Sequence, residues 1–313
     1  MTAATVTTTL RLGTRGSELA RTQSQAVADA ITAATGTPVE LVHIVTEGDR
    51  SSAAITQLGG TGVFVAAIRR ALLEGSVDLA VHSYKDLPTA AEPGLIIAAV
   101  PARQDPRDAL VARDGLTLGE LPPGSTIGTG APRRVAQLRA LGLGLDVVPI
   151  RGNVDTRMGR VAAGDLDAVV LARAGLARLG RLDLITETLD PLQVLPAPAQ
   201  GALAVECRTS DARTRELLGR LEDPTARACV VAERATLAAL EAGCSAPVAA
   251  YAEVAEGEHG AELFLRASVT AIDGSDAVRG SVTGPLPEAA ALGRALAGEL
   301  LDRGAAELMA VSR

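Results

Sequence analysis

The chain has 313 residues, 47% of them hydrophobic, and its 30 basic and 37 acidic side chains give a net charge of −7 at pH 7. This length exceeds the roughly 100–200 residues typical of one domain, so two or three domains are expected. The acidic balance and the presence of only two tyrosines and two phenylalanines argue against a nucleic-acid or membrane-surface binder.

Strands and helices alternate through the first two thirds of the chain. Strands are expected at Leu10–Thr14, Val39–Thr46, Val77–His82 and Leu95–Val100, with helices at Glu18–Ala34 and Phe64–Leu73. After Pro101 a similar order restarts, with strands near Ala109–Val111, Ser125–Gly128, Asp146–Ile150 and Ala168–Leu171 and helices near Arg133–Ala140 and Val154–Ala163. This alternation predicts α/β domains with mostly parallel sheets.

Two breaks divide the chain. The polar segment Arg103–Arg107 contains a proline, and Pro191–Pro198 has three prolines in eight residues. After about Pro224 the sequence predicts a helix and a Gly-Cys loop. Strands near Ala246–Glu253 and Glu262–Thr270 and a terminal helix at Pro287–Arg303 complete this part. The last part is therefore expected to be a small α+β domain.

The cysteines and the N-terminus bear on location and metal binding. Cys207, Cys229 and Cys244 form neither a CxxC pair nor a cysteine–histidine spacing, so no metal site is predicted. A sparse, odd set of cysteines is typical of a reducing cytosol. The first ten residues do not resemble a signal peptide, and no run reaches the ~18 apolar residues of a membrane span. We expect a cytoplasmic protein that binds neither membrane nor nucleic acid.

The first candidate site is the turn between the first strand and the first helix. Ser17 fits a helix N-cap, and the free backbone N–H groups at a helix start attract anions. Arg11 and Arg15 beside them would complete a carboxylate or phosphate site. The alternative is a capped helix with surface arginines.

The second candidate site follows the strand Val77–His82, where Ser83, Lys85 and Asp86 precede Pro88. In open α/β sheets ligands bind beyond the carboxyl ends of the strands. A carboxylate at that place can stabilise a developing cation. The alternative is a solvated turn in which His82 is a packed histidine.

Arginines recur at further strand ends. Arg133 and Arg134 begin a helix after a Gly-Thr-Gly turn that lacks the complete GxGxxG fingerprint. Cations there oppose the helix dipole and cost roughly 0.3–1 kcal/mol unless an anion offsets them. The segment Arg151–Arg157, and Arg173 and Arg178, follow the next two strands. Together the arginines indicate a ligand that carries several carboxylates or phosphates.

The third group of candidates lies near the end of the chain. The proline-rich segment before Gln200 leads into a buried strand, as expected where a chain returns to its first domain. Cys244 lies in a glycine loop, whereas Cys207 and Cys229 lie in apolar runs typical of inert core cysteines. The residues alone leave a structural role for Cys244 open.

Taken in order, these segments resemble the porphobilinogen deaminase family from about Leu10 to the terminal helix. The combination of His-Ser-Tyr-Lys-Asp-Leu-Pro at 82–88, Arg-Gly-Asn-Val at 151–154 and the Gly-Cys loop at 243–244 is specific to it. The resemblance implies two α/β domains similar to type II periplasmic binding proteins, over residues 1–102 with 200–221 and over 103–199. It also implies a small C-terminal α+β domain over 222–313.

The resemblance further implies the reaction and its residues. Four porphobilinogen molecules are polymerised head to tail with loss of ammonia to give hydroxymethylbilane, by a monomer whose Cys244 holds a dipyrromethane cofactor through a thioether. Asp86 is the implied catalytic residue, since it stabilises the cation formed as ammonia leaves. The implied cofactor contacts are Ser83, Lys85, Asp86, Ala131, Arg133, Arg134, Gly152 and Arg157. The implied substrate contacts are Arg11, Arg15, Ser17, Phe64, Arg151, Arg157, Arg178 and Gln200.

The sequence departs from the family pattern at several positions. Gln57 and Thr61 stand where lysines are usual, Ala131 replaces a hydroxyl residue, and Pro198-Ala199 replaces Val-Gly. These changes affect carboxylate affinity and loop mobility more than the class of reaction. The main rival is a non-catalytic binding protein for a small polycarboxylate, which would give Asp86 and Cys244 no role. A phosphate or nucleotide enzyme is less favoured, because no complete phosphate-binding loop is present.

Overall fold

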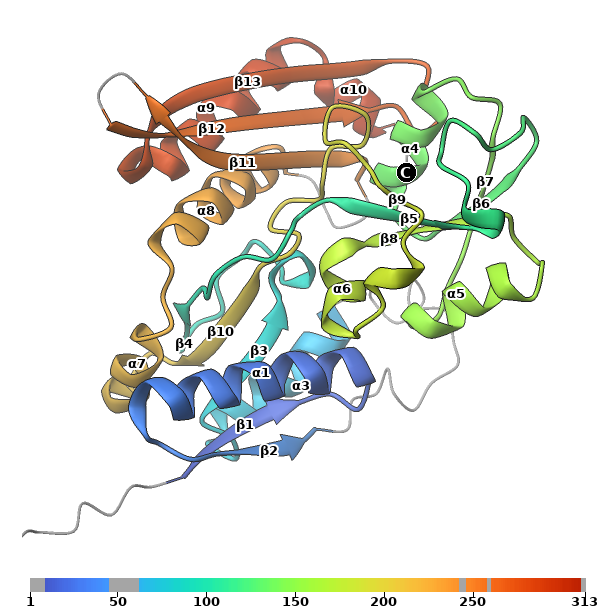
Figure 1. Ribbon diagram of the computed structural model, residues 1–313. Coiled ribbons are helices and arrows are strands. Elements are labelled where there is room, and N and C mark those ends of the chain that lie inside the picture. The colour runs from blue at the N-terminus through green and yellow to red at the C-terminus, as the bar shows by residue number, and fades with distance from the viewer. Residues whose placement is uncertain (1–8, 45–61, 242–245, 258–259, 311–313) are drawn as a thin grey trace, which may run out of the picture. The chain divides into compact units, whose positions relative to one another are not determined.

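The computed structural model describes residues 9–44, 62–241, 246–257 and 260–310 (Figure 1). The chain divides into two compact units. Unit 1 comprises residues 1–103 and 202–224, and unit 2 comprises residues 104–201 and 225–313. The boundaries of the three predicted domains stay a prediction.

Unit 1 contains a five-stranded sheet in the order β2-β1-β3-β10-β4. Its strands are β1 (Leu10–Thr14), β2 (Val39–His43), β3 (Leu79–Ser83), β4 (Leu95–Ala99) and β10 (Leu203–Arg208). Its helices are α1 (Glu18–Thr35), α3 (Gly62–Leu73), the short 3-10 helix η1 (Tyr84–Asp86) and α7 (Ala212–Gly219). Only β10 is antiparallel to its neighbours, so the other four strands share one direction.

An apolar core fixes the strands and the first helix of unit 1. Leu12 of β1, Leu79 of β3 and Val205 of β10 are completely buried together with Ile31 of α1. Figure 1 shows α1, in blue, lying along this sheet. Burying such side chains contributes roughly 1.5–3 kcal/mol each, which holds the ends of β1 and β3 in place.

Unit 2 begins with a second five-stranded sheet in the order β7-β6-β8-β5-β9. Its strands are β5 (Asp108–Ala112), β6 (Thr126–Thr129), β7 (Asp146–Pro149), β8 (Ala168–Ala172) and β9 (Glu187–Thr188). Its helices are η2 (Arg113–Gly115), α4 (Pro132–Ala140), α5 (Val154–Ala162), α6 (Arg173–Arg178) and η3 (Leu182–Leu184). Here β5 is the strand that runs against the others, and it pairs antiparallel with both β8 and β9.

Unit 2 ends with an antiparallel sheet, β11-β12-β13, packed against helices (Figure 1). The strands are β11 (Val248–Gly257), β12 (Gly260–Thr270) and β13 (Ala277–Pro285). The helices are α8 (Pro224–Ala239), η4 (Leu286–Glu288), α9 (Ala289–Asp302) and α10 (Ala305–Ala310). The sequence predicted only two of these strands. It missed β13 because glycines interrupt its strand pattern, and a Cβ at Gly280 would lie 2.8 Å from Leu296 of α9.

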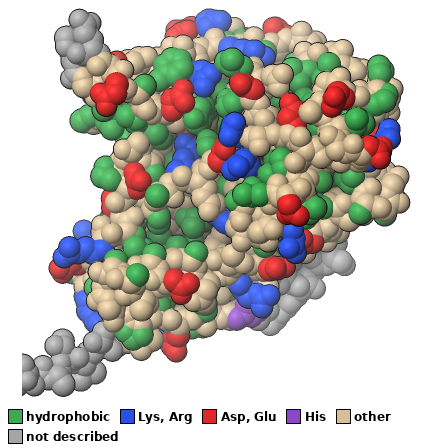
Figure 2. All heavy atoms as spheres, in the orientation of Figure 1, with side chains coloured by type: hydrophobic (Ala, Val, Ile, Leu, Met, Phe, Trp, Pro, Cys, Tyr) green, Lys and Arg blue, Asp and Glu red, His purple; other side chains and the backbone are tan. Residues whose placement is uncertain are grey.

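The predicted fold class is confirmed, with two α/β sheets followed by a small α+β part. The predicted strands and helices of both α/β regions are present, with ends shifted by a few residues. No helix among the described residues is both long and apolar enough to cross a bilayer. Basic and acidic side chains are interspersed on the face shown in Figure 2, where the described residues form no extended basic patch.

Candidate functional site

The turn after β3 presents a carboxylate at the carboxyl edge of the first sheet. Tyr84 and Leu87 are buried, and Tyr84 donates its backbone N–H to the carbonyl of Ala202. Between these anchors Lys85 is half-buried and Asp86 is exposed on η1. The buried residues therefore fix the backbone, while the Asp86 carboxylate faces outward.

Two buried polar groups support this turn. The side-chain amide of Gln23, on the buried face of α1, lies 3.1 Å from the hydroxyl of Ser83. His82 is buried on β3, and its Nε2 lies 3.2 Å from Glu206 of β10, which also binds Arg69. His82 is thus a packed histidine. Sequence reasoning missed Gln23, although a glutamine four residues before Val27 on an apolar helix face was a usable signal.

The start of α1 separates the two arginines of the first predicted site. Ser17 accepts a hydrogen bond from the backbone N–H of Ala20 at 3.3 Å, which confirms the predicted N-cap. Arg11, at the amino end of β1, donates to Asp78 at 2.8 Å and to the carbonyl of Gly75 at 2.7 Å. Arg15 follows β1 at the opposite, carboxyl edge. The guanidinium of Arg11 holds Asp78 at the amino edge of the sheet, and the predicted substrate contact of Arg11 stays a prediction.

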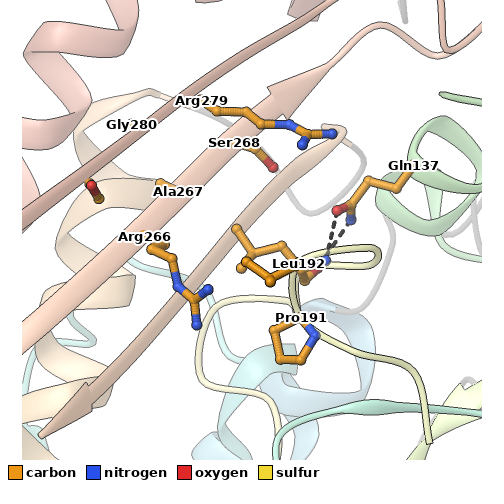
Figure 3. A pocket seen from close by; sticks show the side chains of 10 residues that line it. Gln137, Pro191, Leu192, Arg266, Ala267, Ser268, Arg279 and Gly280 are labelled. Atoms are coloured by element: carbon orange, nitrogen blue, oxygen red, sulfur yellow. Dashed lines mark hydrogen bonds between the residues drawn. The ribbon is translucent and has the colours of Figure 1, made fainter. Parts of the chain in front are cut away.

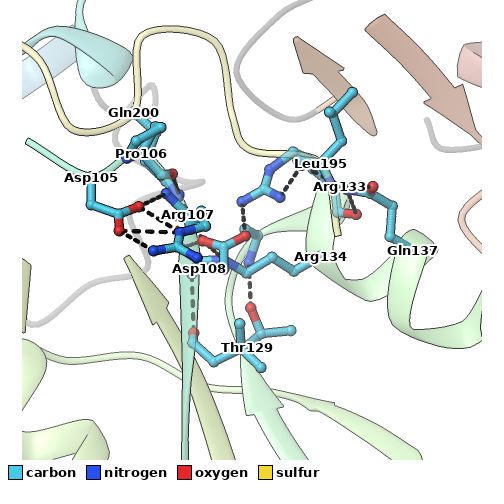
Figure 4. Close-up of polar contacts among 12 residues, drawn as sticks. Asp105, Pro106, Arg107, Asp108, Thr129, Arg133, Arg134, Gln137, Leu195 and Gln200 are labelled. Carbon is cyan, nitrogen blue, oxygen red and sulfur yellow. Dashed lines mark hydrogen bonds and ion pairs between the residues drawn. The ribbon is translucent and has the colours of Figure 1, made fainter. Parts of the chain in front are cut away.

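A buried ion cluster lies at the equivalent edge of the second sheet (Figure 4). Because β5 runs against the other strands, its first residue, Asp108, pairs with Ala172 at the carboxyl end of β8. Arg133 donates to Asp108 at 2.7 Å and to the carbonyl of Leu195 at 2.6 Å. Arg134 donates to Asp108 at 2.7 Å and to the carbonyl of Val170 at 3.0 Å.

Asp108 is completely buried, and its charge is set by its neighbours. Burial alone raises the pKa of this carboxyl, but the charges of Arg133 and Arg134 and hydrogen bonds from Arg134 and Gln200 outweigh it, so the pKa is held well below its usual value. Two guanidinium groups share this single carboxylate, which leaves one positive charge in excess. The buried Nε of Arg133 also has no hydrogen-bond partner within the described part of the chain.

Gln200 belongs to the same cluster. Its side-chain amide donates to Asp108 at 2.7 Å and to the carbonyl of Pro106 at 2.7 Å. The residue is completely buried and holds Asp108, and its predicted contact with substrate stays a prediction. Sequence reasoning missed Asp108 itself. A carboxylate that opens an apolar strand, as in Asp-Ala-Leu-Val-Ala, needs a buried partner and was the available signal.

Two further arginines rest on neutral carbonyl groups. Arg157 donates its Nε to the carbonyl of Gly152 at 2.8 Å, and Arg178 donates to the carbonyl of Gly201 at 2.7 Å. Burial lowers the pKa of both, that of Arg178 to about 10, and the charge of Arg134 lowers the pKa of Arg157 further. Both stay cationic at neutral pH. Neither forms an ion pair with a carboxylate among the described residues.

The remaining predicted residues of unit 2 lie near these arginines in the sequence. Arg151 is exposed, and Gly152 has a φ of +106°, where a Cβ would also lie 2.8 Å from the Thr156 methyl group. Ala131 is the N-cap of α4 and provides no side-chain acceptor. Arg173 is engaged by Asp105 at 3.4 Å.

Some predicted residues lie outside the described part of the chain. These are Cys244, Gln57, Thr61 and the side chain of Phe64. Cys207 and Cys229 are buried, as expected of core cysteines, and burial raises the pKa of the Cys207 thiol to about 11. The described residues contain no group of three or more side chains that could hold a metal ion.

These features define a class of protein, an α/β protein with a surplus of arginine charge in one unit and an exposed carboxylate in the other. The family description "Porphobilinogen deaminase, dipyromethane cofactor binding domain" matches residues 10–216, and "Porphobilinogen deaminase, C-terminal domain" matches residues 227–302. The chain therefore belongs to the porphobilinogen deaminase family.

Similar proteins agree with this assignment. A porphobilinogen deaminase from Nocardia farcinica is 62% identical over 99% of this chain and 90% of its own length. One from Mycobacterium avium is 61% identical over 97% of this chain and 98% of its own length.

A periplasmic substrate-binding protein of an ABC transporter from Coxiella burnetii has a solved structure with a TM-score of 0.44. It is 14% identical and covers 70% of this chain and 94% of its own, a likeness too low to argue from.

Family membership gives the reaction. The chain is a transferase that polymerises four porphobilinogen molecules, with release of ammonia, to give hydroxymethylbilane in porphyrin biosynthesis. Its first matched region is a domain that binds the dipyrromethane cofactor.

Proposed function

We propose that the chain carries out this reaction on a dipyrromethane attached covalently to Cys244, with Asp86 as the catalytic carboxylate. The observation that carries the proposal is the surplus of positive charge in unit 2. Arg133 and Arg134 share Asp108, and the charge of Arg134 acts on Arg157, while Arg178 binds the carbonyl of Gly201, the residue after Gln200. Asp108 is the one carboxylate that pairs with any of these four arginines among the described residues. Excess buried charge is costly unless an anion compensates it.

The cofactor fits this donor set. Pyrrole units derived from porphobilinogen carry acetate and propionate groups, so both the cofactor and the growing chain present rows of carboxylates. Charge-assisted hydrogen bonds to such groups contribute about 1.5–3 kcal/mol each. In the proposal Arg133, Arg134 and Arg157 hold the cofactor carboxylates, with the Gly152 turn and the Ala131 backbone beside them. When bound, the cofactor supplies the pyrrole end to which new units are added.

A second set of residues is proposed to bind the carboxylates of the substrate. Arg178 is half-buried and bound to a carbonyl, whereas Arg151 is exposed. Arg15 and Ser17 follow β1 at the carboxyl edge of the first sheet, the edge to which Ser83 also belongs. In the proposal these residues bind the acetate and propionate of incoming porphobilinogen. Phe64 stays a predicted contact of the pyrrole rings.

Asp86 has the exposure and the fixed backbone that the chemistry requires. A carboxylate held at one place can accept hydrogen bonds from pyrrole N–H groups and stabilise the cation that develops as ammonia leaves. Lys85 and Ser83 flank it and are proposed to contact the cofactor. The rival function, a non-catalytic polycarboxylate binder, uses the arginines equally well but gives Asp86 no task.

The experiment that tests the attachment is the intact mass of the acid-denatured protein. We expect an excess over the sequence mass equal to two linked porphobilinogen units, located on the peptide that contains Cys244. Cys244→Ser should abolish this excess, whereas Cys229→Ser, at a buried cysteine, should retain it. Attached pyrrole in denatured Cys244→Ser would overturn the assignment. Protein purified without the excess is incubated with porphobilinogen and weighed again.

The oligomeric state and the cellular location complete the proposal. The family resemblance implies a cytoplasmic monomer. Sedimentation equilibrium of the purified chain tests the monomer, for which we expect a mass near 31.8 kDa plus the cofactor. A dimer mass would contradict it.

A further inference from the structure

A polar pocket lies within unit 2 and borders the arginine cluster described above at Leu195 and Gln137 (Figure 3). It has a volume of about 300 Å³ and is bounded by β12, β13 and the segment 191–195. Ser268 pairs with Arg279 and Arg266 pairs with Ser281 across the two strands, so these four polar side chains share one face of the sheet. The opposite face carries the apolar core that packs against α8 and α9.

Arg266 is held in a prepared position on this face. Its guanidinium lies 5.5 Å from the ring centre of Tyr251 and 5.4 Å from that of Phe264. Its distance to Glu253 is 3.5 Å, and Glu253 also accepts a hydrogen bond from the Tyr251 hydroxyl. Two of the four aromatic side chains in the sequence thus contact this one arginine. Even so, the buried Nε of Arg266 has no hydrogen-bond partner among the described residues.

Arg279 adds a second positive charge. It is exposed, its side chain forms no ion pair within the described ranges, and in Figure 3 it extends from the sheet on the same side as Arg266. Glu253 is the only carboxylate that pairs with either arginine among the described residues. The pocket therefore carries one uncompensated positive charge beside two serine hydroxyl groups.

The other wall of the pocket is apolar and fixed. It consists of Pro191, Leu192 and Leu195, of which Leu192 is 72% exposed, the highest value among the large apolar side chains described. The backbone N–H of Leu192 donates to Asp190 at 2.7 Å. The backbone of Leu195 is held by the side chain of Gln137 through bonds of 2.7 and 3.0 Å. Leu192 and Leu195 are therefore held at fixed places along the apolar wall.

We propose that this pocket is a second ligand site, which binds a small carboxylate with an apolar body. The two guanidinium groups and the serine hydroxyls would bind the carboxylate, since arginine presents a planar donor fork that matches it. The apolar body would lie against Pro191, Leu192 and Leu195. The volume is at the lower end of the roughly 300–1,000 Å³ found for ligand pockets, which limits the ligand to one or two rings.

The test uses naphthoate as the probe and titration calorimetry on the holoenzyme. We expect binding that weakens at least about tenfold in Arg279→Ala and in Leu192→Ser, and a similar loss when the neutral naphthalenemethanol replaces naphthoate. Arg294→Ala, at an exposed arginine of α9 outside the pocket, is the matched control and should bind as the wild type does. Both pocket positions are exposed, so unchanged thermal midpoints are expected and verify folding.

Two results would overturn the proposal. Naphthoate affinity that is the same in Arg279→Ala, Leu192→Ser and wild type shows that the pocket is not the site. Displacement of naphthoate by porphobilinogen, together with loss of binding in Arg178→Gln, assigns the probe to the substrate-binding arginines. Because Arg279 and Leu192 are not among the residues of the transferase proposal, either result leaves that proposal standing.

Discussion

Asp86 and Asp108 lie at equivalent places in two similar sheets, and the structure surrounds them differently. Asp86 follows β3 and Asp108 opens the reversed strand β5, so each lies at the carboxyl edge of the parallel strands of its sheet. Asp108 is completely buried between Arg133 and Arg134, whereas Asp86 is exposed. The comparison shows that one edge position has become a structural ion cluster, while its counterpart keeps a carboxylate available for chemistry.

The largest expected effect is the loss of stability in Asp108→Asn. This change leaves two guanidinium groups buried without a counter-charge, which typically costs about 3–5 kcal/mol. Urea unfolding of the apoprotein measures the difference. Asp86→Asn is the matched control, and a surface change of this kind should stay within about 0.5 kcal/mol of the wild type. Equal destabilisation by both variants would remove the contrast between the two aspartates.

The same variant has a distinct pH dependence. The folded-state pKa of Asp108 lies below its unfolded value, so its stabilising effect is complete above the unfolded pKa of about 3.9 and is lost as the pH falls toward the folded pKa. The stability difference between wild type and Asp108→Asn should therefore be constant from pH 7 to about pH 5 and shrink below about pH 4. A difference that grows on acidification would contradict this account.

Asp86→Ala tests the proposed catalytic role of Asp86. Removing a preorganised charge that stabilises a developing cation lowers kcat by about 10²–10³, equivalent to roughly 3–4 kcal/mol. Steady-state release of hydroxymethylbilane by the holoenzyme measures it, with intact mass used to verify that the cofactor is attached. Near-normal turnover of a correctly loaded variant would remove Asp86 from its proposed role.

The arginines on neutral carbonyls should show smaller effects. Arg178→Gln is expected to lower kcat/KM, because one charge-assisted bond to a substrate carboxylate is lost. The decrease should correspond to a loss of about 1.5–3 kcal/mol of transition-state stabilisation. Arg181→Gln is the control, since Arg181 is half exposed and pairs with Asp155 at 3.5 Å. If both variants lose the same activity, the effect reflects total charge and not a carboxylate contact.

The smallest predicted effect concerns the start of α4, next to the Asp108 cluster. Ala131 occupies the N-cap with extended φ and ψ values of −105° and 117° but offers no side-chain acceptor. Ala131→Ser should stabilise the fold by about 0.5–1 kcal/mol by accepting a backbone N–H of the first turn. Urea unfolding measures the gain, and Ala131→Val, which adds bulk without an acceptor, should not show it.

The sequence predicted what depends on neighbours along the chain. The alternation of strands and helices, the Ser17 cap and the position of Asp86 after an apolar strand are all local patterns. It contained no signal for partners that lie far apart along the chain. Arg11 meets Asp78 across the sheet, 67 residues away, and the place of Asp108 depends on the reversed direction of β5. Neither relation leaves a periodic signal in the sequence.

The insertion of β10 also affects the order in which the chain folds. β10 separates β3 from β4 in the first sheet, yet its residues follow the whole second sheet in the chain, whose last strand ends at Thr188. During synthesis the second sheet can close first, while β3 and β4 wait for residues 203–208 with open edges. Such long-range pairing slows folding and exposes strand edges to aggregation. Truncations before residue 203 should therefore retain a folded second sheet while the first stays incomplete and prone to association.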